Sequence, residues 1–222
     1  MKTMSMTAQR LNTAVMALAL LAGNAMGQAA DPAPAGADAK AGPKWSFRAS
    51  AYGYFIPDDR KYVQPSFSAD RERLHLEARY NYEDKETGSL WAGANFGAGD
   101  KLKLDVTPMV GGVFGNTAGI SPGYKLSLGC GKVEFYSEGE YVFDLRDRQG
   151  NFFYAWSELS YSPVEWMRAG IVGQRTRAYQ TELDIQRGFL VGFSGRKIDF
   201  TAHVFNLGWT DPTVILAIGV EF

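Results

Sequence analysis

The last ten residues of this 222-residue chain, TVILAIGVEF, constrain the fold more than any other segment. Val214, Leu216, Ile218, Val220 and Phe222 recur at every second position. Successive side chains of a strand point to opposite faces, so these five share one apolar face. Such a strand, with nothing after it to cover that face, would be an aggregation hazard in water. The pattern therefore favours a strand that closes a β-barrel and turns its apolar face towards lipid.

This ending resembles the C-terminal signal of bacterial outer-membrane β-barrel proteins, which typically finish on Phe or Trp after alternate apolar residues. The resemblance implies an all-β fold, a transmembrane antiparallel up-and-down barrel, in the outer membrane of a Gram-negative-type envelope. It also implies outer-membrane lipids as neighbours, and the barrel-assembly machinery as a partner of residues 213–222. It points to no specific characterised family and to no particular function.

The start of the chain predicts export. Residues 1–27 read as a secretory signal peptide, because the apolar run at 11–22 follows a basic start and precedes small residues suited to cleavage. Cleavage after Ala29 is a second option. A membrane-spanning helix would need about 20 apolar residues, more than this run provides. We expect 28–44, rich in Ala, Pro and Gly, to be a disordered tether, and 45–222 to form the barrel.

Charge and cysteine content exclude some classes of function. The formal net charge of −1 argues against nucleic acid as a partner. Cys130 is the only cysteine in the sequence, which excludes an internal disulfide. It lies in a predicted Gly-Cys-Gly turn, and we interpret it as an incidental turn residue rather than a catalytic thiol.

Turn signals and two-residue alternation from position 45 onward predict about twelve strands. The expected strands are 45–55, 62–69, 74–82, 89–96, 102–110, 124–128, 133–143, 152–161, 166–176, 185–194, 198–205 and 213–222. Connections after even-numbered strands are short, whereas some after odd-numbered strands, such as 111–123, are longer. This matches short periplasmic turns and longer external loops, with both termini periplasmic. Ten strands are the alternative, if the first hairpin is a plug or loop.

The two faces of the expected strands differ in chemistry. In 74–83 (LHLEARYNYE), one face carries Leu, Leu, Ala, Tyr and Tyr, and the other His, Glu, Arg, Asn and Glu. A soluble sandwich would also alternate, but the charged faces suit a hydrated lumen better. Aromatic residues at strand ends predict two interfacial girdles. These are Trp45, Tyr161, Trp166 and Phe222 at the periplasmic rim, and Phe55, Tyr82, Phe143 and Phe153 at the external rim.

The alternation predicts a lumen lined by charged residues of both signs. The candidates are Arg48, His75, Glu77, Arg79, Lys103, Asp105, Lys125, Glu134, Glu138, Glu140, Glu158, Arg168, Asp199 and His203. They form either a structural ion-pair network that closes the barrel or the charged walls of a narrow passage. Beside them, the inward residues of the last strand, Ile215, Ala217 and Gly219, are small or apolar, which leaves space at the seam or lets Arg48 lie across it.

Three functional hypotheses follow. The first is a porin-like narrow channel or passive transporter for small polar or charged solutes. The second is a closed barrel with a structural role or a role in binding lipopolysaccharide, for which the outward-facing Arg175 and Arg187 are the candidate phosphate ligands.

The third hypothesis is an outer-membrane hydrolase. Both histidines are expected to point inward, away from the lipid-facing Ser137 and Ser157, so no lipid-facing Ser/His pair arises. Metal-ligand spacings are also absent from the sequence. A lumenal site with His75 or His203 as the base and a nearby carboxylate stays open, although a structural role for the two histidines is favoured. We expect neither a cofactor nor a metal.

Overall fold

The computed structural model describes residues 44–57, 61–178, 184–208 and 212–222. The predicted signal peptide 1–27 and nearly all of the predicted tether 28–44 lie outside these residues. Within the described residues, no helix has the length and apolar character needed to cross a membrane.

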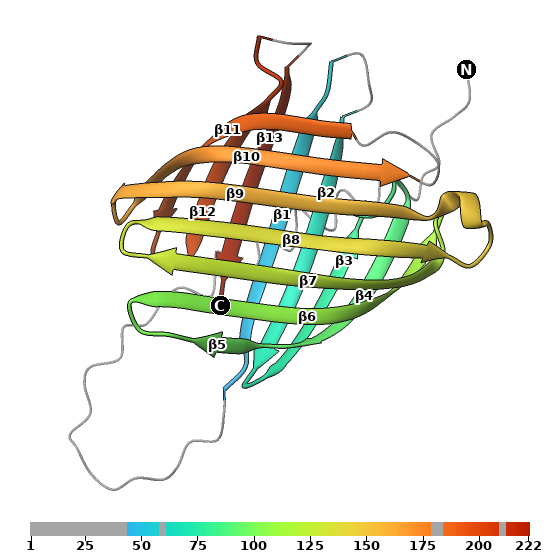
Figure 1. Cartoon of the computed structure of the whole chain (residues 1–222), viewed down its shortest axis with the longest axis horizontal. Helices are drawn as coiled ribbons and strands as arrows, with labels where there is room; N and C mark the ends of the chain where they lie inside the picture. The colour runs from blue at the N-terminus through green and yellow to red at the C-terminus, as the bar shows by residue number, and fades with distance from the viewer. Residues whose placement is uncertain (1–43, 58–60, 179–183, 209–211) are drawn as a thin grey trace, which may run out of the picture. The chain divides into compact units, whose positions relative to one another are not determined.

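The described residues form antiparallel strands joined by turns and loops (Figure 1). The strands are β1 (Ser46–Phe55), β2 (Tyr62–Arg71), β3 (Leu74–Tyr80), β4 (Thr87–Ala94), β5 (Phe96–Ala98), β6 (Leu102–Gly115), β7 (Gly119–Cys130), β8 (Val133–Asp144), β9 (Phe152–Val164), β10 (Met167–Ala178), β11 (Asp184–Gly195), β12 (Ile198–Phe205) and β13 (Thr213–Glu221). One short 3-10 helix, η2 (Arg148–Gly150), lies between β8 and β9.

Apart from β4 and β5, strands that are neighbours in sequence pair with each other, and β1 pairs with β13 to close the barrel. The closing register runs from Arg48 opposite Glu221 to Phe55 opposite Val214. Both β4 and β5 pair with β6, so the short β5 continues β4 beyond Asn95. The barrel therefore has twelve strands, and the predicted fold class is confirmed.

The two ends of the barrel differ in their connections. The connections after β2, β5, β7, β9 and β11 are at most three residues long, and the chain also enters β1 and leaves β13 at this end. We call it the turn end and the opposite one the loop end. The predicted long connection 111–123 is wrong: β6 extends to Gly115 and β7 begins at Gly119.

Glycines explain that error. Gly111 and Gly123 had suggested a loop, but they lie inside strands, where the indole of Trp91 covers them. A Cβ added at Gly111 would lie 2.5 Å from the Trp91 ring, and one at Gly123 would lie 3.0 Å from it. Glycine in a strand interior often marks such a close approach, and here it makes room for an inward-facing tryptophan.

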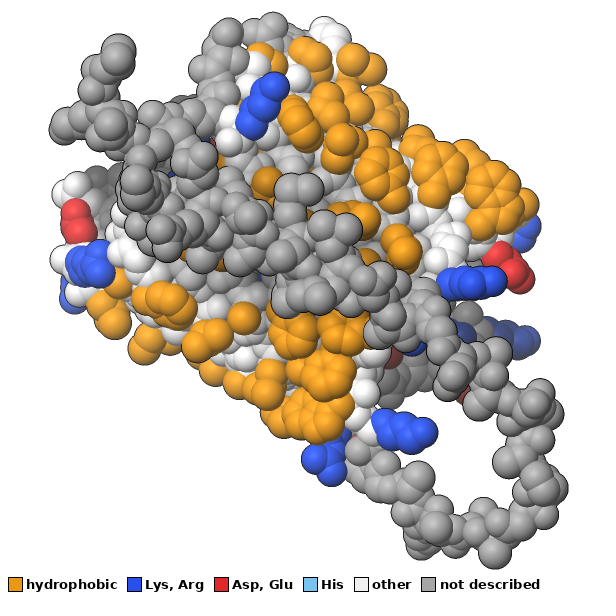
Figure 2. Space-filling model, turned by 180° about the vertical axis from the view of Figure 1, so that it is seen from behind, with side chains coloured by type: hydrophobic (Ala, Val, Ile, Leu, Met, Phe, Trp, Pro, Cys, Tyr) orange, Lys and Arg blue, Asp and Glu red, His pale blue; other side chains and the backbone are white. Residues whose placement is uncertain are grey.

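Large apolar side chains are exposed on the outer wall, as a lipid-facing surface requires. Figure 2 shows hydrophobic side chains gathered over the described part of this wall. At the turn end Trp45, Tyr161, Trp166 and Phe222 are all exposed. Tyr82 departs from the expected external girdle, because the chain turns at Asn81 (φ 58°) and directs Tyr82 into the lumen.

Candidate functional site: a charged lumenal cavity below a packed layer

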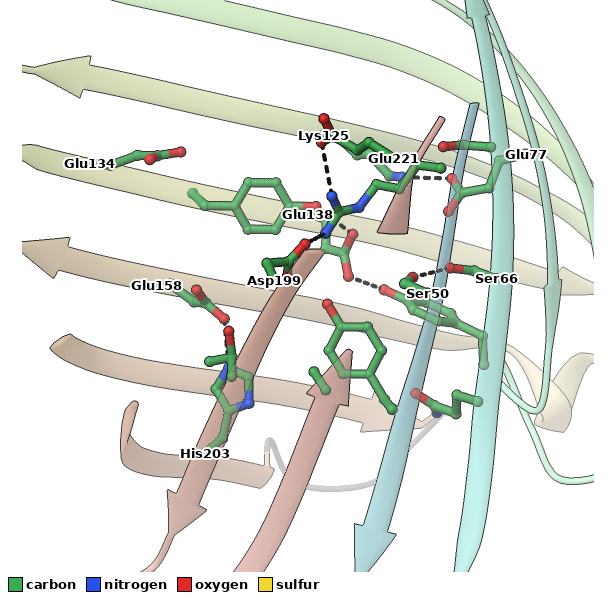
Figure 3. Close-up of a pocket in the computed structure, with 18 of the residues that line it drawn as sticks. Ser50, Ser66, Glu77, Lys125, Glu134, Glu138, Glu158, Asp199, His203 and Glu221 are labelled. Atoms are coloured by element: carbon green, nitrogen blue, oxygen red, sulfur yellow. Dashed lines mark hydrogen bonds and ion pairs between the residues drawn. The ribbon is translucent and has the colours of Figure 1, made fainter. Parts of the chain in front are cut away.

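The half of the lumen nearer the turn end holds a cavity of about 400 Å³ (Figure 3). Nine of the fourteen predicted lumen residues line it: Arg48, Glu77, Lys125, Glu134, Glu138, Glu158, Arg168, Asp199 and His203. They come from strands all round the barrel, because period-two alternation turns every second side chain inward.

At the barrel seam, Arg48 joins three strands. Its guanidinium contacts Asp199 of β12 at 2.5 Å and Glu221 of β13 at 2.9 Å. Gly219 allows this arrangement, because an added Cβ there would lie 2.3 Å from Nη2 of Arg48. The glycine therefore lets the arginine lie across the seam.

A second group of charges surrounds Glu158 on β9. One carboxylate oxygen lies 3.0 Å from Nη1 of Arg168, on the adjacent strand, and the other lies 2.9 Å from Nε2 of His203. The indole N–H of Trp156 donates to the same carboxylate at 2.9 Å. Arg168 also donates to the hydroxyl of Thr201 at 2.9 Å. These contacts fix both side chains, Arg168 and His203, against the cavity wall.

Glu77 on β3 is the centre of a third group. Its Oε2 lies 2.7 Å from the amine of Lys125, 3.0 Å from Arg79 and 3.4 Å from His75. Lys125 belongs to β7, so its side chain passes over β4 and β6 to reach β3. His75 in turn contacts Asp70 at 2.7 Å through its other ring nitrogen.

Two carboxylates on β8 lack a cationic partner among the described residues. Glu138 accepts hydrogen bonds from the hydroxyls of Tyr82 at 2.5 Å and Tyr136 at 2.7 Å. Glu134 accepts one from Ser127 at 3.0 Å. With Glu221 included, the cavity lining carries six carboxylates against three lysine and arginine side chains. The cavity is therefore acidic, and β8 carries the uncompensated charge.

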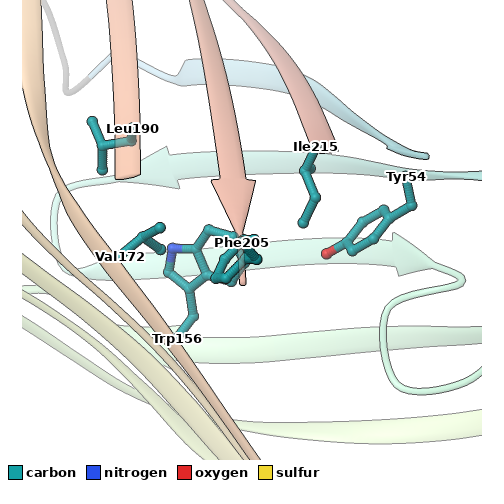
Figure 4. Close-up of a cluster of buried hydrophobic side chains, with 6 residues drawn as sticks. All are labelled: Tyr54, Trp156, Val172, Leu190, Phe205 and Ile215. Atoms are coloured by element: carbon teal, nitrogen blue, oxygen red, sulfur yellow. The ribbon is translucent and has the colours of Figure 1, made fainter. Parts of the chain in front are cut away.

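The half of the lumen nearer the loop end is packed with side chains. A buried hydrophobic cluster joins Tyr54, Trp156, Val172, Leu190, Phe205 and Ile215 (Figure 4). The ring of Phe205 is fully buried and lies 5.3 Å from that of Trp156, edge to face. Tyr52, Tyr62, Tyr136 and Tyr154 are among the partly buried residues packed against this cluster.

Across the lumen from this cluster, Arg79 organises the rest of the packing. It is only 7% exposed, and besides Glu77 it contacts Glu140 at 3.4 Å. Its guanidinium stacks over the rings of Tyr82, at 4.3 Å, and Trp91, at 4.6 Å. Tyr82 meets Tyr154 edge to face at 5.5 Å, which connects Arg79 to the hydrophobic cluster. We call Arg79, Glu140 and Trp91 the Arg79 group, and this group, Tyr82, Tyr154 and the hydrophobic cluster together the packed layer.

Five predicted lumen residues do not line the cavity. His75, Arg79 and Glu140 are buried beside it or in the packed layer. Lys103 and Asp105 are exposed near the turn end of β6. On the outer wall, Arg175 of β10 and Arg187 of β11 are exposed.

Sequence reasoning missed most of the uncharged lining. Tyr52, Tyr82, Tyr136 and Gln64 line the cavity, and so do Ser50 and Ser66, whose hydroxyls lie 2.7 Å apart. Most of them lie on the same face of their strands as charged lumen residues, so the two-residue alternation was the signal that could have identified them. The charged residues alone did not.

Neither histidine forms a hydrogen bond with a serine within the described part of the chain. The hydrogen-bond partners of His75 among these residues are Asp70 and Glu77, and that of His203 is Glu158. A serine-histidine arrangement for hydrolysis is therefore not assembled among these residues.

Comparison with known proteins shows the fold. No family model matches the sequence, and no curated protein matches it. A solved structure of the KdgM porin superposes with a TM-score of 0.58 at 9% identity, covering 79% of this chain and 99% of that one. A NanC porin structure gives a TM-score of 0.54 at 12% identity, covering 78% of this chain and 98% of that one. A second KdgM porin structure, in complex with disordered oligogalacturonate, gives 0.51 at 9% identity, covering 80% and 98%. The chain therefore shares the architecture of small porins.

Proposed function

We propose that the protein is an outer-membrane β-barrel that acts as a narrow channel, or passive transporter, for small polar or charged solutes. The observation that carries this proposal is the acidic cavity of about 400 Å³ inside a barrel that shares its fold with porins. Apolar side chains on the outer wall support insertion in a membrane. By the usual arrangement of such barrels, the turn end faces the periplasm and the loop end faces outward.

The lining charges bear on the kind of solute. Oligogalacturonate, bound in one of the KdgM porin structures, is an anionic sugar chain. Here the carboxylates outnumber the basic side chains, so the cavity attracts cations and repels anions. We propose that small cationic or zwitterionic solutes are favoured, and that oligogalacturonate is not a substrate.

A second candidate is a closed barrel with a structural role, and the packed layer is the observation that favours it. Between the cavity and the loop end, Phe205, Leu190 and Ile215 are almost fully buried. A solute that crosses the barrel must displace part of this layer.

Planar-bilayer conductance of purified, refolded protein separates the two candidates. Tyr154→Ala supplies an opened comparison, because Tyr154 joins the two parts of the packed layer. Tyr161→Ala, on the outer wall at the turn end, is the matched control. We expect wild type to conduct, Tyr154→Ala to conduct more, and Tyr161→Ala to match wild type. Absence of wild-type conductance at every voltage and salt concentration would overturn the channel, and conductance from Tyr154→Ala alone would then support the closed barrel.

A further inference from the structure

The outer wall carries an apolar groove of about 370 Å³ over β8–β11, which belong to the near side of the barrel in Figure 1. Strand register explains the groove. Ser137, Ser157 and Gly173 lie opposite one another on β8, β9 and β10, so their outward side chains form one row of small residues. Arg187 of β11 lies opposite Gly173 and ends that row.

The neighbouring rows shape the two sides of the groove. Towards the turn end, a row of large residues, Phe135, Leu159, Ile171 and Phe189, forms a wall across the same four strands. Towards the loop end, the next row again begins with small residues, Gly139 and Ala155, and continues to Arg175. Ser157 and Gly173 therefore floor the groove and Arg187 lines its β11 side, while Arg175 lies just beyond the groove, one row nearer the loop end.

The polar atoms of the groove floor are already satisfied. The hydroxyls of Ser137 and Ser157 lie 3.1 Å apart, and Ser137 also donates to the carbonyl oxygen of Trp156 at 3.2 Å. The hydroxyl of Tyr124 lies 3.2 Å from that of Ser137. The floor can thus face a hydrocarbon chain without leaving a hydrogen-bonding group unpaired.

The two arginines, in contrast, have no ion-pair partner among the described residues. Arg175 and Arg187 are both exposed. In the β10–β11 register they are diagonal neighbours, because Gly173 pairs with Arg187 and Arg175 pairs with Ile185. A cation without a counter-charge is costly on a lipid-facing wall. A phosphate group would supply that charge, and guanidinium groups bind phosphate in bidentate fashion.

We propose that this groove holds an acyl chain of one lipid A molecule, the lipid part of lipopolysaccharide, while Arg175 and Arg187 bind a phosphate of its headgroup. Both arginines lie in the parts of β10 and β11 nearer the loop end. In the orientation proposed above this is the outer leaflet, where lipopolysaccharide resides. The proposal depends on outer-membrane location and not on whether the barrel conducts.

Binding of bisphosphorylated lipid A to the refolded protein, measured by native mass spectrometry, tests the proposal. Arg175→Gln combined with Arg187→Gln should weaken binding roughly tenfold or more, because it removes charge-assisted hydrogen bonds. Gly173→Leu fills the groove and should weaken binding as well. It should leave the barrel folded, because an added Cβ meets only the Gln186 carbonyl oxygen, at 3.9 Å.

Two controls separate this site from general attraction of anionic lipid. Arg71→Gln combined with Arg73→Gln removes two exposed arginines near the turn end and should leave binding unchanged. Dephosphorylated lipid A should bind wild type as weakly as bisphosphorylated lipid A binds the double glutamine variant of the groove arginines. Unchanged binding in either groove variant, an equal loss in the turn-end control, or equally tight binding of phosphatidylglycerol would overturn the proposal. A barrel that fails to conduct but passes this test refutes only the channel.

Discussion

The Arg79 group offers the sharpest test of whether the lumenal charges hold the barrel together. We consider Arg79→Met, which keeps an unbranched, though shorter, side chain and removes its charge. The substitution breaks the contacts of Arg79 with Glu77 at 3.0 Å and Glu140 at 3.4 Å, and the stacking over Tyr82 and Trp91. Glu77 keeps Lys125, at 2.7 Å. Glu140, only 4% exposed, keeps no other described ion-pair partner.

The expected loss of stability follows from that burial. Removing one partner of a buried ion pair costs about 3–5 kcal/mol, since the remaining charge is uncompensated. The two ring contacts add roughly 0.5–2 kcal/mol each. Protonation of Glu140 limits the total, so we expect a loss of about 4 kcal/mol in the free energy of unfolding. With a denaturant slope of about 3 kcal/mol per molar urea, the unfolding midpoint should fall by about 1.3 M.

The assay is urea unfolding of the refolded barrel in micelles, followed by tryptophan fluorescence. Arg79→Met combined with Glu140→Gln should recover roughly half of the loss, because the uncompensated charge is gone. Arg71→Met, at an exposed arginine near the turn end, loses only an exposed contact with the Trp45 ring and should change stability by at most about 1 kcal/mol. A midpoint shift for Arg79→Met no larger than that of Arg71→Met would refute the structural role of the Arg79 group. So would the absence of any recovery in the double variant.

Three further predictions concern the cavity, the seam and the orientation. Glu138→Gln removes one uncompensated carboxylate, which attracts a cation and repels an anion by about 1 kcal/mol each at 4 Å in water, so the cation-over-anion permeability ratio should fall about thirtyfold. An unchanged reversal potential in a salt gradient would contradict this. Gly219→Val should displace Arg48 from Asp199 and destabilise the barrel by about 1–3 kcal/mol, seen as a lower midpoint in the same urea assay, and a wild-type midpoint would contradict it. Cys130 is exposed at the turn end of β7. A maleimide too large for outer-membrane pores should therefore label it only after the outer membrane is permeabilised, and labelling of intact cells would reverse the proposed orientation.

Strand positions could be predicted from sequence because lipid outside and charge inside produce a strict two-residue alternation. In β12, for example, Ile198 and Phe200 are exposed, whereas Thr201 and His203 are almost fully buried. The seam was likewise predictable from the alternating residues of β13. Alternation gives the face of each side chain but not its height along the barrel, so it did not separate cavity residues from those of the packed layer.

Contacts between side chains of distant strands could not be predicted either, because alternation does not give the height of a side chain along the barrel. Lys125 reaches Glu77 over two intervening strands, and that contact depends on the stagger of the closed barrel. Similarly, the row formed by Ser137, Ser157 and Gly173 exists only in the observed register of three strands. The inward turn of Tyr82 follows from a positive φ at Asn81, a conformation that asparagine tolerates but does not require.

The charged lumen residues were interpreted either as a structural ion-pair network or as the walls of a passage, and each interpretation fits one half of the lumen. Near the turn end, charged groups such as Glu138 face a cavity, where they can act on a solute. In the packed layer, Arg79 and Glu140 are buried together and act on each other. A passage through the packed layer could open either between ion-pair partners or between aromatic side chains, and the two differ in cost. Separating a buried ion pair costs about 3–5 kcal/mol, whereas turning an aromatic side chain off its preferred rotamer costs about 0.5–1.5 kcal/mol. A solute that crosses the layer would therefore pass where Tyr82 meets Tyr154, next to the carboxylate of Glu138. The rings of these two tyrosines, rather than the ion pairs, would set the width of the passage.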